Sequence, residues 1–251
     1  MISLKTSREI SLMRDAGRIA AQALVLVGEA VRPGVTTEEL AQIAHKHIIT
    51  SGAVPTFLNY NGFPGSICVS LNEEVIHGIP SRKRILREGD IVSVDLGATY
   101  KGFVGDTAST FPVGKITPAA QKLCDTTKEA LYAAILFAVP GNRVGDISAA
   151  VQTHCEAQGY SLVRDYTGHG VGRRLHEDPV VPNFGRAGHG VKLRTGMTLA
   201  IEPMVNLGRA QTRVLNDKWT VVTRDGKLSA HYEHTIAITH DGPVILTLAE
   251  D

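Results

Sequence analysis

The sequence has little of what marks several common classes of protein. It has 3 cysteines in 251 residues, Cys68, Cys124 and Cys155, and they form no CxxC pair. Such a set indicates neither a thiolate zinc site nor a disulfide framework, and it suits a reducing compartment. The 26 basic and 25 acidic residues nearly cancel, so no strong field attracts nucleic acid or an anionic membrane.

Long apolar runs are also missing. The longest, residues 130–139, is far shorter than the ~20 residues that a membrane span needs. Charged side chains are spread through the first half of residues 1–31, so no apolar core follows a basic start and we expect no signal peptide. With 43% hydrophobic residues, the chain can bury a substantial core. We therefore expect a soluble, cytoplasmic protein.

Apolar periodicity and Pro-Gly pairs divide the chain into a repeated order of elements. Spacings of three and four residues predict helices over 7–30, 37–52, 118–138 and 146–159. Strand-forming runs predict strands over 66–72, 91–98, 104–111, 198–205, 218–223 and 231–239. The order is therefore two helices and several strands, and then the same again.

The two parts of the chain resemble each other. Residues 34–52 are similar to 141–159, and each segment follows a long helix and a Pro-Gly break. This similarity predicts a single domain, 1–251, with pseudo-twofold-related halves of about 1–115 and 116–251. Helices gathered on one side of an antiparallel sheet correspond to the α+β class.

Two aspartates lie in neighbouring strand-like runs. Asp95 and Asp106 are separated by a stretch with Tyr100 and Lys101 at its middle. A turn centred there would place the two carboxylates directly cross-strand, with Cβ atoms about 4.5–5.5 Å apart. Aspartate is depleted in strands, and facing like charges destabilise a sheet unless something cancels them. The pattern therefore predicts a bound cation.

Three further polar groups stand out in the second half. His169 lies in a glycine-rich bend, Glu202 ends an apolar run, and Glu233 directly precedes another. Taken singly, a residue such as His169 more often has a structural role than a functional one. For each glutamate, a structural and a functional role are equally common. Together with the aspartates, however, these groups are hard to explain by structure alone, because buried carboxylates need partners.

The charges of this set favour a dinuclear site. Four carboxylates supply four negative charges, which two divalent cations would neutralise. Oxygen ligands with one imidazole and no thiolate suit Mn, Fe, Co or Zn. Two metals about 3.5–4 Å apart can lower the pKa of a bridging water enough to supply hydroxide near neutral pH. The sequence therefore predicts a hydrolase.

Five long motifs carry a resemblance to a known family. They are NGFPGSICVSLNEEVIHGIP (61–80), GDIVSVDLGATYKGFVGDTASTF (89–111), GHGVGRRLHEDP (168–179), GMTLAIEPM (196–204) and DKWTVVTRDGKLSAHYEHTIAIT (217–239). Through them the chain resembles the type I methionine aminopeptidases, in their short bacterial form, which have the pita-bread fold. The resemblance implies a monomeric metalloaminopeptidase that removes the N-terminal methionine from nascent proteins.

The resemblance also implies a metal-ligand set. At the matching positions, Asp106 and Glu233 would bridge two divalent metals. Asp95 would hold one metal, and His169 with Glu202 would hold the other. Metal-activated hydroxide would attack the first peptide bond, and Glu202 would be the general base.

Substrate contacts follow from the same resemblance. His77 would lie near the scissile amide, and His176 would polarise its carbonyl and stabilise the tetrahedral intermediate; without the resemblance, either histidine is more often structural. Specificity would come from an apolar pocket fitted to an unbranched thioether. The pocket wall would comprise Tyr60, Phe63, Cys68, His77 and Trp219.

Several positions complicate this interpretation. A two-residue turn at 225–226 would set Trp219 opposite Tyr232 and off the face of Glu233, so either the turn is longer, a bulge shifts the register, or Trp219 reaches the pocket around an edge. Leu175 replaces a common aromatic residue, and Phe57 replaces a small residue or cysteine. Both changes would reshape the pocket rim.

Two further sites are suggested by other segments. The segments around Asn72 and Ser229 resemble a family site for a structural monovalent cation, but Glu74 departs from the usual residue there. Basic stretches at 82–84 and 173–174 could contact the ribosome, although a solvated charged face is the commoner explanation. We expect no specificity for nucleic acid.

Two alternative functions stay open. X-Pro dipeptidases and aminopeptidases P belong to the same superfamily but usually carry an additional N-terminal domain, and type II enzymes carry a long insertion. A metal-free ribosome- or RNA-associated protein of this fold would not need five ligands and two further histidines. Release of methionine from a Met-Ala-Ser peptide after addition of Mn or Co discriminates between the enzyme and the binding protein.

Overall fold

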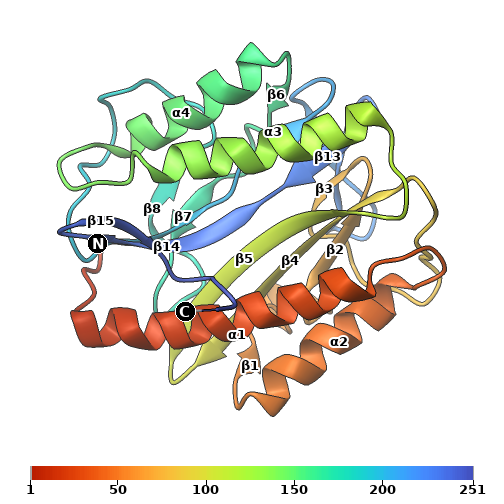
Figure 1. The fold of residues 1–251 in the computed structure, drawn as a ribbon, viewed down its shortest axis with the longest axis horizontal. Helices are drawn as coiled ribbons and strands as arrows, with labels where there is room; N and C mark the ends of the chain where they lie inside the picture. Colours follow the sequence, from red (N-terminus) through yellow and green to blue (C-terminus); the bar gives the residue numbers. More distant parts are fainter. Residues whose placement is uncertain (1, 251) are drawn as a thin grey trace.

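The computed structural model describes residues 2–250, in which four helices pack against one face of a curved antiparallel sheet (Figure 1). The helices are α1 (Ser7–Ala30), α2 (Thr37–Thr50), α3 (Pro118–Ile135) and α4 (Val144–Ala157). Each helix end lies within three residues of its predicted position. None of the helices in this part of the chain is long and apolar enough to cross a bilayer.

Threonine caps explain where three helices begin. The hydroxyls of Thr6 and Thr36 each accept the backbone N–H of a glutamate three residues later, whose carboxylate accepts the threonine N–H in return. Thr117 caps α3 by accepting the N–H of Ala120. Such caps satisfy backbone donors that would otherwise lack partners in the first turn.

Most strands belong to a nine-stranded sheet with the order β1-β4-β5-β14-β9-β7-β8, in which β2 also pairs with β4 and β15 with β14. Two three-stranded sheets have the orders β13-β10-β6 and β11-β12-β3. The strands are β1 (Val54–Pro55), β2 (Cys68–Leu71), β3 (Glu74–Ile76), β4 (Ile91–Tyr100), β5 (Phe103–Pro112), β6 (Ser161–Leu162), β7 (Gly168–Gly170), β8 (Glu177–Val181), β9 (Thr198–Ile201), β10 (Met204–Asn206), β11 (Thr212–Val214), β12 (Val221–Thr223), β13 (Ser229–His231), β14 (Glu233–Thr239) and β15 (Gly242–Ile245).

The first core lies between β4 and the helices α1 and α2. Val92, Val94 and Leu96 are fully buried there against apolar residues of both helices. Helix α1 approaches β5 so closely that a Cβ on Gly105 would collide with the backbone of Gly17. Because side chains alternate along a strand, Asp95 must point to the opposite face of the sheet. This alternation separates the packing face from the polar face.

A second core covers the other part of the sheet. Leu199 of β9 and Ile236 of β14 are buried with Leu123 of α3 and Ile147 of α4. Figure 1 shows the pair α1 and α2 along one side of the molecule and the pair α3 and α4 along the other, with β5 and β14 between them. The assignment of one domain with halves of about 1–115 and 116–251 stays a prediction.

The structure corrects two predicted strands and one pairing. The predicted strand 231–239 begins in β13 and continues in β14, and these two strands lie in different sheets. The predicted strand 198–205 is divided into β9 and β10, which lie in different sheets, because the chain breaks at Glu202-Pro203 and proline offers no N–H to a ladder. The segment after Trp219 does not form a hairpin with β13. Its strand β12 pairs instead with β3 and β11.

Candidate metal centre

A row of cross-strand neighbours carries two of the predicted ligands. Asp95 of β4 lies opposite Ala108 of β5, and Ala108 lies opposite Glu233 of β14. Cys68 of β2 lies opposite Asp95 on its other side. The small side chain of Ala108 therefore separates two carboxylates on the polar face, which leaves space between them.

The prediction that Asp95 and Asp106 are directly cross-strand is wrong. The β4–β5 turn consists of Lys101 and Gly102, with φ of 47° and 79°, so Tyr100 pairs with Phe103 and Asp106 pairs with Gly97. Such a turn needs positive φ at both central residues, which favours glycine. The register differs by two residues from the one predicted. A shift of two keeps both aspartates on one face, so Asp106 is a diagonal neighbour of Asp95.

A buried threonine positions Asp106. The hydroxyl of Thr235 accepts the backbone N–H of Asp106 at 3.0 Å and donates to its carbonyl oxygen at 2.8 Å. The side chain thus replaces the regular ladder between β5 and β14, which pairs only Glu233 with Ala108 and His234 with Thr107. The regular ladder is therefore interrupted at Asp106, the residue whose carboxylate belongs to the centre.

His169 is fixed in orientation and in tautomer. It lies on β7 between two glycines, where a Cβ on Gly170 would collide with the backbone of Asp178. Its Nδ1–H donates to the carbonyl oxygen of Gly170 at 2.9 Å. Nε2 is then a free lone pair, 3.6 Å from Asp106 Oδ2 and 3.5 Å from Glu202 Oε1. A neutral imidazole with one nitrogen tied in this way is the form that binds metals.

Asp106, His169 and Glu233 form a group whose ligand atoms all lie within 4.8 Å of one another. The carboxylate atoms Asp95 Oδ1, Asp106 Oδ1 and Glu233 Oε1 are buried and have no hydrogen-bond partner in residues 2–250. Buried polar atoms are normally satisfied, so these atoms indicate a missing partner. The donor set and the unsatisfied oxygens both fit divalent cations.

Burial without a cation makes these carboxylates hard to ionise. It raises the pKa of Asp95 to about 7 and the pKa of Glu202 to about 8. The pKa values of Asp106 and Glu233 are also raised, first by burial and then by the neighbouring carboxylates. A bound cation would remove this penalty because it stabilises the ionised forms.

Sequence reasoning missed one residue of this centre, His231. Its side chain is 1% exposed, both ring nitrogens lack hydrogen-bond partners among the described residues, and Nε2 lies 3.5 Å from Glu202 Oε2. The signal was available, because His231 is two residues before Glu233, and residues two apart in an extended segment point to the same face.

The centre opens into a cavity of about 180 Å³, lined by all five predicted ligands and all five predicted wall residues. Aromatic rings form one side of it. The ring centroids of Phe63 and Trp219 are 5.2 Å apart, and those of His77 and Trp219 are 6.3 Å apart. Phe57 and Leu175, the two departures from the family pattern, are also lining residues.

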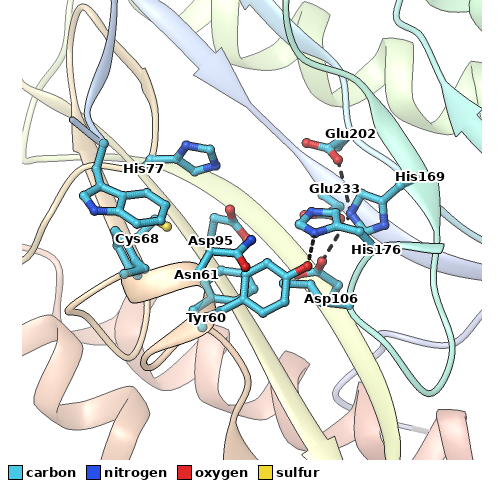
Figure 2. Close-up of a pocket in the computed structure, with 14 residues that line it drawn as sticks. Tyr60, Asn61, Cys68, His77, Asp95, Asp106, His169, His176, Glu202 and Glu233 are labelled. Atoms are coloured by element: carbon cyan, nitrogen blue, oxygen red, sulfur yellow. Dashed lines mark hydrogen bonds and ion pairs between the residues drawn. The ribbon is translucent and has the colours of Figure 1, made fainter. Parts of the chain in front are cut away.

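Figure 2 shows how this cavity is divided. His77 and Cys68 lie on one side, and His169, His176 and Glu202 lie on the other. Burial, followed by the nearby carboxylates, raises the pKa of the Cys68 thiol well above its ordinary value, so it remains protonated. Burial also lowers the pKa of His77 to about 4, so the imidazole is neutral near pH 7. These two side chains are therefore uncharged.

Trp219 lies just before β12, a strand of the three-stranded sheet β11-β12-β3, and not in a hairpin with β13. The strand that follows it, β12, pairs with Ile76 of β3, immediately before His77. The backbone N–H of Trp219 donates to Asp217 Oδ1 at 2.9 Å, which fixes the bend before the strand. The difficulty over the Asp225-Gly226 turn disappears because β12 and β13 are not paired.

The polar groups near the suggested monovalent-cation site are engaged with protein partners. The carbonyl oxygen of Asn72 accepts the N–H of Ser229 at 2.9 Å. Glu74, which departs from the family pattern, accepts the backbone N–H of Leu71 and forms an ion pair with Arg84. A monovalent cation there stays a prediction.

Comparison with known proteins identifies the family. The model of metallopeptidase family M24 matches residues 11–240. The chain belongs to this family. It is 52% identical, over the full length of both chains, to a Clostridium acetobutylicum protein named methionine aminopeptidase.

Solved M24 structures confirm the predicted pita-bread fold. Methionine aminopeptidase from Thermotoga maritima is 47% identical, with a TM-score of 0.98, over 99% of this chain and 100% of that chain. Prolidase from Pyrococcus horikoshii is 25% identical, with a TM-score of 0.78, over 98% of this chain but 64% of that chain. Membership of M24 confirms a metallopeptidase and implies divalent metal, for which the Asp106, His169 and Glu233 group supplies ligands.

Proposed function

We propose that this protein removes N-terminal methionine from polypeptides by hydrolysing the first peptide bond. One observation carries the proposal: a single cavity of about 180 Å³ joins the carboxylate and imidazole ligands to an apolar recess. The full-length similarity to proteins named methionine aminopeptidase supports it. The recess offers aromatic edges and a protonated thiol, which suit a flexible, polarisable thioether.

We further propose that the centre holds two divalent cations, of Mn, Fe, Co or Zn. Asp106 and Glu233 would be shared, Asp95 would serve one cation, and His169 with Glu202 would serve the other. Such cations, when bound, polarise a carbonyl and lower the pKa of water to near neutrality. The unsatisfied oxygens of three of these carboxylates support this assignment.

The side chains then have separate roles in the reaction. Glu202 accepts a proton from the attacking water and transfers it to the leaving amine, a role that needs a pKa near the working pH. His176 lies against His169, with ring centroids 4.3 Å apart, and donates to the carbonyl oxygen of the scissile bond. His77, on the aromatic side of the cavity, contacts the substrate near the scissile amide.

Hydrolysis of short peptides tests the proposal. Protein stripped of metal and reloaded with Mn or Co should release methionine from Met-Ala-Ser, but not from acetyl-Met-Ala-Ser, whose amine is blocked. Glu202→Gln is the inactive control. Absence of methionine release with every divalent metal would contradict the enzyme function. Faster cleavage of an X-Pro dipeptide would favour a prolidase, which shares the fold.

The cellular setting remains a set of proposals. We propose a cytoplasmic monomer that acts on nascent polypeptide N-termini and does not recognise nucleic acid. Two of the basic residues suggested for ribosome contact have partners within the protein: Arg84 pairs with Glu74, and Arg173 pairs with Glu9 while lying over the ring of Phe103. Arg84 is therefore engaged within the protein, whereas Arg173 stays 65% exposed, so a ribosome contact would use Arg173 and the other basic side chains of these segments.

A further inference from the structure

A preformed loop holds Tyr60 against the centre. Asn59, Asn61 and Gly62 have φ values of 64°, 51° and 89°, which asparagine and glycine tolerate better than other residues. The N–H of Asn59 donates to the carbonyl oxygen of Phe63 at 2.8 Å, and the N–H of Phe63 donates to that of Tyr60 at 2.9 Å. The position of Tyr60 is thus built into the loop.

The hydroxyl of Tyr60 contacts one nitrogen of His176. The Tyr60 Oη to His176 Nδ1 distance is 2.7 Å, and the ring centroids are 5.3 Å apart (Figure 2). A phenol has one proton to donate, and a neutral imidazole has one nitrogen that accepts and one that donates. If Tyr60 donates, Nδ1 is the acceptor and the ring proton is on Nε2. Nε2 is then the only ring nitrogen left for a substrate.

The neighbouring His169 shows the opposite arrangement. Its Nδ1 contacts a carbonyl oxygen, that of Gly170, which can only accept, so Nε2 of His169 has no proton. The two imidazoles lie 4.3 Å apart at 68°. One needs a lone pair at Nε2 to bind a cation, and the other needs a proton there to donate to an oxyanion. The partner of Nδ1 decides which form each ring takes.

The chemistry of the two groups favours a donating phenol. A phenol O–H is a stronger donor than an imidazole N–H, and an unprotonated ring nitrogen is a stronger acceptor than a phenol oxygen, so the 2.7 Å contact is best made by Tyr60 Oη–H and a bare Nδ1. In the reverse arrangement His176 Nδ1–H would donate to the phenol oxygen and leave a bare lone pair at Nε2. A lone pair would repel the oxygen of a polarised carbonyl.

We propose that Tyr60 is a positioning residue that holds His176 in its Nε2–H tautomer, so that Nε2 donates to the substrate carbonyl oxygen. The effect on catalysis rests on the aminopeptidase function proposed above, whereas the tautomer can be measured without any reaction. Tyr60 is thus more than a wall of the methionine pocket.

Long-range ¹H–¹⁵N correlation spectra of the Zn²⁺-loaded protein with ¹⁵N-labelled histidine test the tautomer. His176→Asn assigns the signals. In the unmodified protein, His176 should show a protonated nitrogen at Nε2 and an unprotonated one at Nδ1. In Tyr60→Phe the two nitrogen shifts should move toward each other as tautomers mix. Protonation at Nδ1 in the unmodified protein, an imidazolium at pH 7.5, or unchanged shifts in Tyr60→Phe would overturn the proposal.

Kinetics of Tyr60→Phe test the consequence. We expect kcat to fall by about 3-fold to 10-fold, with KM changing less than about 2-fold, because part of the population keeps a donor whose full loss costs 10²–10³-fold. Tyr132→Phe is the matched control, since its hydroxyl contacts His234 Nε2 at 3.1 Å outside the cavity, and both constants should stay unchanged. Mixed tautomers with unchanged kcat would refute the catalytic role. Absence of methionine release by the unmodified protein would refute the proposed function alone.

Discussion

Replacing Lys5 with methionine should destabilise the protein by about 3 kcal/mol, because it leaves a buried carboxylate without its cation. Lys5 Nζ lies 2.6 Å from Glu177 Oε2, and the two side chains are only 5% and 11% exposed. The other oxygen, Glu177 Oε1, keeps the backbone N–H of Arg174 at 3.1 Å. We therefore expect the low end of the 3–5 kcal/mol cost of breaking a buried pair.

Thermal unfolding measures this loss. For a chain of this size, about 3 kcal/mol corresponds to a decrease in Tm of about 6–12 °C. The double variant Lys5→Met with Glu177→Gln should recover most of the loss, because no buried charge remains. Arg173→Met breaks a pair whose arginine is 65% exposed and should cost less than about 1 kcal/mol.

The pH dependence gives a second test of the same pair. Burial alone would raise the pKa of Glu177, but hydrogen bonds from Lys5 and Arg174 hold it below its ordinary value. The pair therefore stabilises the protein above the unfolded pKa of glutamate, about 4.3, and this contribution is lost as pH falls through the folded pKa. The stability difference between the unmodified protein and Lys5→Met should narrow in acid. If Lys5→Met lowers Tm by less than about 2 °C, or if the double variant is as unstable as the single one, the reasoning is refuted.

Three other predictions concern the metal centre. Asp106→Asn should lower bound metal, measured by elemental analysis, and reduce activity at least about 10²-fold because a shared ligand loses its charge; full metal content with full activity would contradict its role. The free energy of unfolding of chelator-treated protein should fall by about 1–3 kcal/mol between pH 6 and pH 8. The folded pKa values of Asp95 (about 7) and Glu202 (about 8) lie above the unfolded ones, so stability falls as pH rises. Denaturant titration should show this slope disappear when metal is restored, and an unchanged slope would count against cation binding. Thr235→Val, nearly the same in shape, should cost about 1–3 kcal/mol in the same titration because two buried backbone groups of Asp106 lose their partner; a loss below about 0.5 kcal/mol would be too small for that role.

The sequence alone predicted the features that depend on neighbouring residues. Apolar spacing and Pro-Gly breaks located α1 to α4, because helical periodicity and helix termination act within one or two turns. The prediction that Asp95 and Asp106 share one face of neighbouring strands is correct despite the register error, because side chains two residues apart in a strand lie on the same face. The five predicted ligands do line one cavity.

Register and pairing were decided by contacts between distant segments. The predicted pairing of Asp95 with Asp106 was wrong by two residues. The register is set by the type of the turn at Lys101 and Gly102, which the sequence of the two strands does not specify. The short strands β3, β7 and β8 carry too few residues for a periodic signal.

The tertiary structure also decided the state of the individual side chains. The sequence names His169 and His176 without saying which ring nitrogen carries a proton. Gly170 and Tyr60 decide that, and Tyr60 is far from His176 along the chain. A residue type determines which atoms can donate or accept, whereas the partner that folding brings to those atoms determines which of them does. The sequence therefore determined the chemistry available to this protein, and tertiary contacts set the geometry in which that chemistry is used.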